Sequence, residues 1–247
     1  MRHIMIFTVG ILLFIVILMA LNVCTLYEPF NEQFVDFHIV CATHDRNTSF
    51  LDTLDLSYTI LGHKDTTDIP NKGGEGLKYL YYIIKNYDSL PKHIIFIHDH
   101  DESWHHRGKI SENMNRFIQE YIRHGRKYYN FNSIRYDFDV DIYRKSNSFR
   151  DFWDNNLLPR FGTYEDALLA NSKDFICCAQ FIVSRETIQA HPIEFYKRLY
   201  DWIVVKTTNE GIGKNTLPDG RDDPYASYHT GRFIEWVWEL IFRDKVV

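Results

Sequence analysis

Cysteine is scarce in this sequence, and its spacing excludes two kinds of covalent or metal framework. The 247 residues contain four cysteines, Cys24, Cys41, Cys177 and Cys178, and none of them forms a Cys-x-x-Cys pair. Small disulfide scaffolds need a higher density of cysteine, and structural zinc sites commonly use such pairs. We therefore expect the thiols to be core residues, in a core that the 16% aromatic content makes rich in rings.

An excess of basic residues is also lacking. Lysine and arginine together number 28, against 33 aspartates and glutamates, which gives a net charge of −5. Proteins that bind nucleic acid usually carry a basic surface, so no nucleic-acid partner is expected. The sequence shows no internal repeat and no low-complexity segment.

Long apolar runs are absent except at the N-terminus. Ile4–Val23 is twenty residues without a charge, which at about 1.5 Å per residue spans a bilayer core of about 30 Å. A cleaved signal peptide is the alternative, but its apolar stretch is usually about 7–15 residues. Arg2 precedes the run and acidic residues follow it, which predicts a type II single-pass membrane protein. We expect an anchor over 1–26, a stalk over 27–36 and one extracytoplasmic or luminal domain over 37–247, with a glycosylation triplet at Asn47.

The sequence pattern of this domain predicts an α/β fold. Apolar, β-branched runs at 37–43, 57–62, 93–98 and 175–184 predict buried strands, and helical periodicity predicts helices at 75–87, 111–124, 192–206 and 229–242. Strands that alternate with helices are typical of parallel sheets. We expect a GT-A-like (Rossmann-like), mostly parallel sheet flanked by helices.

The densest cluster of titratable side chains follows the strand at 93–98. His98, Asp99, His100 and Asp101 lie where ligands bind in open α/β sheets, at the carboxyl end of a strand. Asp99 and Asp101 form an Asp-x-Asp pair, and two such carboxylates favour a hard divalent cation between them. GT-A glycosyltransferases hold a metal on the donor diphosphate with this motif. The prediction is a Mn²⁺ or Mg²⁺ site at Asp99 and Asp101, with a local capping role as the alternative.

The histidines of the same segment allow a second interpretation. Imidazoles prefer transition ions over magnesium, and His98, His100 and His105 could form a hydrolase-type metal site. Trp104 is either an aromatic platform for a sugar ring or a cover on the core.

Two other segments contribute candidate residues. Asn71–Gly76 opens a helix, whose exposed N–H groups suit a phosphate, although a plain turn with Glu75 in the first helical turn is the alternative. Glu235 is either a base for an acceptor hydroxyl or a solvated helix residue.

Several stretches together resemble a eukaryotic family of unknown function. Asn-Lys-Gly-x-Glu, Tyr-Leu-x-Tyr-Ile, Phe-x-His-x-His-x-x-x-Trp-His and Cys-Cys-Ala-Gln-Phe occur here in the family's order, over roughly residues 39–242. The positions that the resemblance marks are Asn71, Gly73, Glu75, His98, His100, Trp104, His105, Gln180 and Arg185. The family pattern does not demand aspartate at 99 and 101, which favours the histidines as the working groups. A fainter similarity to rhamnan-synthesis and capsular glycosyltransferase-like proteins implies sugar chemistry.

Three functional hypotheses remain open on this basis. The first is a metal-dependent glycosyltransferase-like enzyme that uses a nucleotide sugar and a glycan acceptor, with His98, His100 and Glu235 as catalytic candidates. In it, Asn71, Gly73, Glu75, Trp104 and His105 would bind the donor. The second is a hydrolase that uses a histidine-bound metal. The third is a non-catalytic binding or structural protein, in which the polar cluster is a hydrogen-bonded network.

Overall fold

The computed structural model describes residues 36–44, 47–62, 68–123, 125, 127–133, 135–137, 145–170, 174–176, 178–211 and 215–243. Residues Phe37–Val247 form one compact unit. The predicted anchor over 1–26 and all of the predicted stalk except Asp36 lie outside the described residues. None of the helices over the described ranges combines the length and the hydropathy that a membrane span requires.

A five-stranded mixed sheet, in the order β2-β1-β3-β7-β4, forms the centre of the unit. β1 pairs in parallel with β2 and β3, whereas β7 runs antiparallel to β3 and β4. The α/β class is confirmed, but two of these four pairings are antiparallel, so the sheet is less parallel than expected. The strands are β1 (Phe37–Ala42), β2 (Ser57–Leu61), β3 (His93–His98), β4 (Tyr128–Asn130) and β7 (Phe181–Ser184).

The strand expected over 175–184 is divided. Its first part belongs to β6 (Asp174–Ile176), which pairs with β5 (Arg135–Asp137) in a separate two-stranded sheet. The backbone at Cys178 has a φ of 81°, in the left-handed region that interrupts an extended chain. Only β7, after this turn, joins the main sheet. Cys178 is also disulfide-bonded, unlike the free, buried Cys41.

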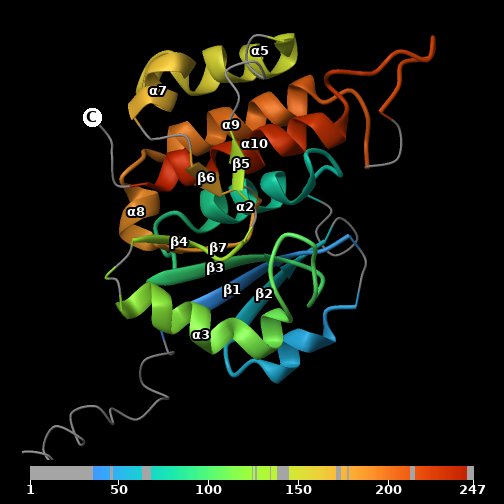
Figure 1. The fold of residues 1–247 in the computed structure, drawn as a ribbon. Coiled ribbons are helices and arrows are strands. Elements are labelled where there is room, and N and C mark those ends of the chain that lie inside the picture. The colour runs from blue at the N-terminus through green and yellow to red at the C-terminus, as the bar shows by residue number, and fades with distance from the viewer. Residues whose placement is uncertain are drawn as a thin grey trace, which may run out of the picture. The chain divides into compact units, whose positions relative to one another are not determined.

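Helices cover both faces of the sheet (Figure 1). α3 lies on one face, α2 and α10 lie on the other with α9 beside them, and α5 and α7 form a further layer outside α9 and α10. The four predicted helices are all present, with ends that differ from the predicted ones by at most two residues. The helical elements are η2 (Ser49–Thr53), α2 (Gly74–Asn86), α3 (Ile110–Arg123), α5 (Asn147–Asn156), α6 (Leu158–Phe161), α7 (Tyr164–Ala170), α8 (Arg185–Gln189), α9 (Ile193–Lys206) and α10 (Ser227–Phe242).

The core between the sheet and α2 and α10 is built from aromatic rings. The Tyr79 and Phe96 rings have centroids 4.7 Å apart, and those of Phe181 and Trp238 are 5.5 Å apart. All four residues are fully buried. Burying a large apolar side chain contributes about 1.5–3 kcal/mol, so this layer fixes the two helices on the sheet.

Glycines let α2 and α10 approach one another closely. A Cβ added to Gly76 would lie 2.0 Å from Cγ2 of Ile234, and one added to Gly231 would lie 3.0 Å from the backbone of Gly73. The amide of Gly73 donates to Oγ of Ser227 (2.9 Å), which ties the start of α2 to the start of α10. This contact brings the first turns of both helices to the edge of the sheet where β3 ends.

Candidate metal and catalytic site

A pocket of about 240 Å³ opens at the carboxyl end of β3. β7 runs opposite to β3, so Gln180 and the start of β7 lie at this same edge, as does Asn130 at the end of β4. The first turns of α2 and α10 form the opposite wall. The lining residues are Gly74, Glu75, His98, His100, Ser103, Trp104, His105, Cys178, Ser227, Tyr228, Gly231, Arg232 and Glu235.

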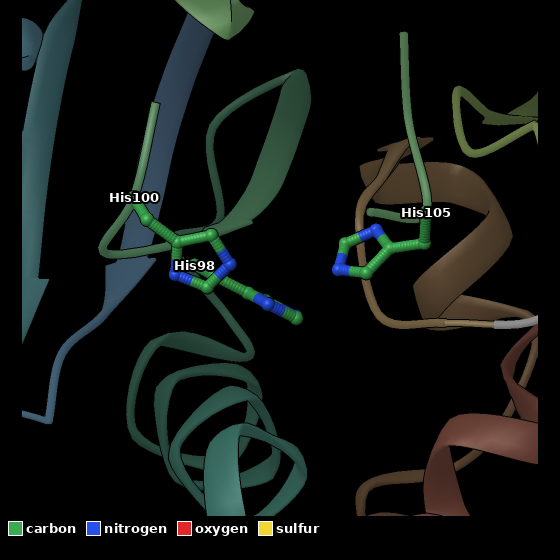
Figure 2. A group of neighbouring side chains, drawn as sticks. All are labelled: His98, His100 and His105. Carbon is green, nitrogen blue, oxygen red and sulfur yellow. The ribbon is translucent and has the colours of Figure 1, made fainter. Parts of the chain in front are cut away.

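Three histidines converge in this pocket. His98 is the last residue of β3, His100 follows two residues later, and His105 approaches from the next turn (Figure 2). One ring nitrogen from each lies within 4.8 Å of the others, and the described residues contain no other group of this kind. The ring centroid of His98 lies 5.2 Å from those of both His100 and His105.

A buried amide network fixes the orientation of His105. Nδ1 of His105 lies 2.6 Å from Oδ1 of Asn132, an acceptor, so Nδ1 carries the proton and Nε2 keeps its lone pair. The Asn132 amide in turn donates to Oδ1 of Asn130 (2.8 Å) and to the carbonyl of Gln180 (3.2 Å). A carbonyl partner on the second nitrogen is the usual support of a metal-binding histidine.

Burial keeps two of these imidazoles neutral. Loss of solvent lowers the pKa of His98 to about 4, an effect that the nearby Glu75 carboxylate only partly offsets. Loss of solvent and the proximity of His98 likewise lower the pKa of His105 to about 4. Near neutral pH both rings therefore offer lone pairs, the form in which histidine binds a metal. Nε2 of His98 is buried and has no hydrogen-bond partner among the described residues.

The first carboxylate of the Asp-x-Asp pair accepts hydrogen bonds from the end of β1. Oδ2 of Asp99 accepts a hydrogen bond from the Thr43 hydroxyl (2.9 Å) and one from the His44 amide. Oδ1 of Asp99 lies 3.3 Å from Nδ1 of His100. Asp99 therefore supports a histidine, as carboxylates do behind metal ligands.

Asp101 is engaged at the start of α3. It accepts hydrogen bonds from the backbone amide and the hydroxyl of Ser111, both at 2.7 Å. This is the local capping role that the sequence left as an alternative for the Asp-x-Asp pair. The oxygens of Asp99 and Asp101 thus accept hydrogen bonds from separate partners, and the expectation that the two carboxylates share a cation stays a prediction.

Two carboxyl groups stand beside the histidines. Oε1 of Glu75 lies 3.5 Å from Nε2 of His98, and Oε2 lies 3.9 Å from Nε2 of His44. Burial and the charge of the nearby Glu75 hold the pKa of Glu235 well above its usual value. Burial opposes ionisation of Glu75, but the proximity of His98, together with His44 and Glu235, outweighs it and keeps the pKa of Glu75 well below the usual value.

Because the pKa of Glu75 is lowered and that of Glu235 is raised, there is a pH range in which the pair shares one proton, with Glu75 ionised and Glu235 protonated. Such a split between two neighbouring carboxyl groups is typical of acid–base pairs in active sites. It also makes Glu235 more than a solvated helix residue, the alternative that the sequence left open.

The remaining predicted residues divide into two groups. Trp104 is 68% exposed at the pocket, so it does not cover the core. Asn71 and Gly73 do not line the pocket: the Asn71 carbonyl accepts from the Gly211 amide, and Gly73 caps α2 with a left-handed φ of 60°. Arg185 donates to the carbonyl of Leu90 (3.2 Å), away from the pocket.

Sequence reasoning missed Asn130, Asn132 and Arg232. Asn130 and Asn132 lie in an aromatic and polar stretch with no motif, and only the pairing of β4 with β7 brings them next to His105. Arg232 follows the glycine at which α10 crosses α2, and its guanidinium lies 4.2 Å from the ring centre of Tyr228. A helical projection of 228–235 would have placed Tyr228, Arg232 and Glu235 on one face.

The comparisons with known proteins give a family and no function. The family described as a protein of unknown function, DUF3431, matches residues 39–247. This confirms the resemblance to a family of unknown function. No curated protein and no solved structure matches the chain.

Proposed function

Since this chain belongs to the DUF3431 family, whose description assigns no activity, we propose its function from the site: a metal-dependent hydrolase with the metal on His98, His100 and His105. The observation that carries the proposal is the convergence of these three imidazoles in a pocket that also holds a carboxyl pair. Three histidines with an open fourth position are a common ligand set of catalytic zinc.

The ligand geometry fits a transition ion after a small contraction. Tetrahedral zinc with Zn–N bonds of about 2.0–2.1 Å separates its ligand nitrogens by about 3.3 Å, and the three nitrogens here lie within 4.8 Å of each other. His105 is held through Nδ1 by Asn132, and His100 is held through Nδ1 by Asp99, which leaves Nε2 of each ring for the ion. Imidazole ligands favour zinc, iron or another transition ion over the Mn²⁺ or Mg²⁺ expected from an Asp-x-Asp pair.

The neighbouring carboxyl groups supply the proton chemistry of hydrolysis. Held by the three histidines, a transition ion would lower the pKa of a bound water toward about 7. The ionised Glu75 takes one proton from the attacking water, whose oxygen forms the new bond to the electrophilic carbon or phosphorus. As the bond to the leaving group breaks, the protonated Glu235 gives its proton to that group. One water is consumed, and the pair ends with the proton on the opposite carboxyl group.

Metal analysis of the full chain tests the ligand assignment. The protein is stripped with chelator, reloaded with Zn²⁺, Fe²⁺, Mn²⁺ or Mg²⁺, dialysed and assayed for bound metal. We expect the wild type to bind about one transition ion per chain. The affinity for this ion should be unchanged in Asp101→Asn and in the control His229→Ala. It should fall by at least tenfold in His98→Ala and in His105→Ala. Stoichiometric zinc in the double variant His98→Ala/His105→Ala would refute the assignment, as would tight Mg²⁺ binding that depends on Asp101.

A glycosyltransferase-like activity is the second candidate, and one observation favours it. The pocket lies at the carboxyl ends of parallel strands, where α/β sheets bind nucleotides, and Arg232 stands at its wall with no ion pair among the described residues. A guanidinium in this place suits a diphosphate.

Incubation of the metal-loaded chain with a panel of nucleotide sugars and glycan acceptors separates the two candidates. Transfer to an acceptor supports the glycosyltransferase. Release of free sugar or another hydrolytic product, without transfer, supports the hydrolase.

A further inference from the structure

Trp104 is an exposed aromatic side chain at the edge of a polar pocket. It is 68% exposed, whereas Trp153, Trp202 and Trp238 are at most 8% exposed. Its ring lies edge-on to His105, with the centroids 5.4 Å apart at an interplanar angle of 82°. An exposed indole leaves a large apolar face in water, a frequent mark of a binding surface.

The residue next to it presents an unused polar group. Oγ of Ser103 is buried and has no hydrogen-bond partner among the described residues, although it lines the same pocket. Buried hydroxyl groups normally have a hydrogen-bond partner. The Ser103 hydroxyl is therefore available to a donor or acceptor of a ligand. Across the pocket, Glu235 and Tyr228 add further hydrogen-bonding groups.

We propose that the pocket binds a saccharide, with one pyranose ring lying on Trp104 beside the three histidines. A pyranose has an apolar C–H face and a rim of hydroxyl groups. The indole matches the face, and the Ser103 hydroxyl and the Glu235 carboxyl match the rim. The presence of a metal beside the sugar ring rests on the proposed function. The contacts with the sugar do not, since they come from these side chains.

Other ligand classes fit the pocket less well. A purely apolar ligand would leave the Ser103 hydroxyl without a partner, at a cost in affinity. A nucleobase would also stack on Trp104, but the pocket lining contains no asparagine or glutamine to read its edge. The volume of about 240 Å³ lies below the range of about 300–1,000 Å³ of drug-sized sites. It therefore accommodates one ring, with the rest of a larger glycan outside.

Fluorescence of the metal-stripped full chain tests the proposal without the metal. Trp104 is the most exposed of the described tryptophans, so acrylamide quenching reports mainly on this residue. The probes are the methyl glycosides of glucose, galactose and mannose, N-acetylglucosamine, and uridine as the nucleoside control. We expect at least one sugar to protect Trp104 from quenching in a saturable way, and uridine to protect it at least tenfold less well.

Calorimetry with the sugar that saturates then tests the contacts. Trp104→Ala should weaken binding by about tenfold or more, since most of the apolar contact area is lost, and Trp104→Tyr should restore part of it. Ser103→Ala should weaken binding by about threefold to tenfold. Tyr58→Ala, which removes an exposed aromatic ring from the edge strand β2, is the control and should bind normally.

Three results would overturn the proposal: no saturation by any sugar up to about 100 mM, equal affinity in Trp104→Ala, or tighter protection by uridine than by every sugar. These outcomes are distinct from failure of the proposed function. Sugar binding in a chain that takes up no transition ion would support the saccharide site and contradict the hydrolase. Zinc uptake without sugar binding would do the reverse.

Discussion

The shared proton of Glu75 and Glu235 makes stability depend on pH in a specific direction. A glutamate in the unfolded chain loses its proton near pH 4.5, whereas the folded Glu235 keeps it because its pKa is raised well above that value. Above about pH 5 the folded state therefore binds one more proton than the unfolded state. A rise in pH then favours unfolding, and the stability of the wild type falls by up to about 1.4 kcal/mol per pH unit from this group.

Glu235→Gln removes this dependence, because the glutamine side chain has nearly the same size and has no proton to lose. Relative to the wild type, we expect the variant to gain up to about 1.4 kcal/mol for each unit of pH between about 5.5 and the folded pKa. Urea denaturation of the metal-stripped chain at pH 5.5, 6.5 and 7.5 measures the difference. Glu194→Gln, an exposed carboxyl at the start of α9, is the control and should change stability by less than about 0.5 kcal/mol.

The reasoning fails if the stability difference between Glu235→Gln and the wild type is the same at all three pH values. It also fails if the difference falls as the pH rises, since Glu235 would then make a rise in pH stabilise the wild type, opposite to the expected sign. A constant loss of stability at every pH would identify Glu235 as a structural residue whose ionisation is not coupled to folding.

Three further predictions concern packing, capping and support of the metal ligands. Gly76→Ala should destabilise the fold by about 1–3 kcal/mol, because its Cβ would lie 2.0 Å from Cγ2 of Ile234. In urea denaturation, a double-mutant cycle should show that Ile234→Ala relieves part of this loss. Additive effects of the two substitutions would contradict the contact. Asp101→Ala should cost about 1–2 kcal/mol through loss of the α3 cap and leave zinc affinity unchanged in calorimetry. Asn132→Leu should weaken zinc binding by about 10–100-fold, since it frees the ring of His105; unchanged affinity would show that the amide network does not orient the ligand.

The local pattern of apolar residues predicted most strands and helices of this chain correctly. The apolar run His93–His98 forms β3, and the periodic run over 75–87 forms α2 within one residue. Such elements are decided by burial of one face, which the spacing of apolar residues records directly. The prediction of one continuous strand over 175–184 was wrong, because Cys178 has a left-handed backbone conformation that interrupts the extended chain. The hydrophobicity of the segment does not encode this feature.

The roles of individual polar side chains were harder to foresee. From the sequence, Asp99 and Asp101 form a plausible metal motif. In the structure, the partners of Asp99 come from the end of β1, and those of Asp101 come from the start of α3. Whether a carboxylate faces a cation or a backbone amide depends on which segments lie across from it, and those segments are distant in the sequence.

By itself, the amino-acid sequence determined the α/β class, most of the secondary-structure elements and the position of the polar cluster after β3, because these follow from local periodicity and from where an apolar run ends. Only the tertiary structure decided which of those polar groups act together. It did so by the reversed direction of β7 and its pairing with β4, which place Gln180 and Asn132 against His105, and by the glycine-mediated contact of α2 with α10, which places Glu235 against Glu75. These are contacts between residues far apart in the chain, and their distances depend on packing that no local pattern specifies.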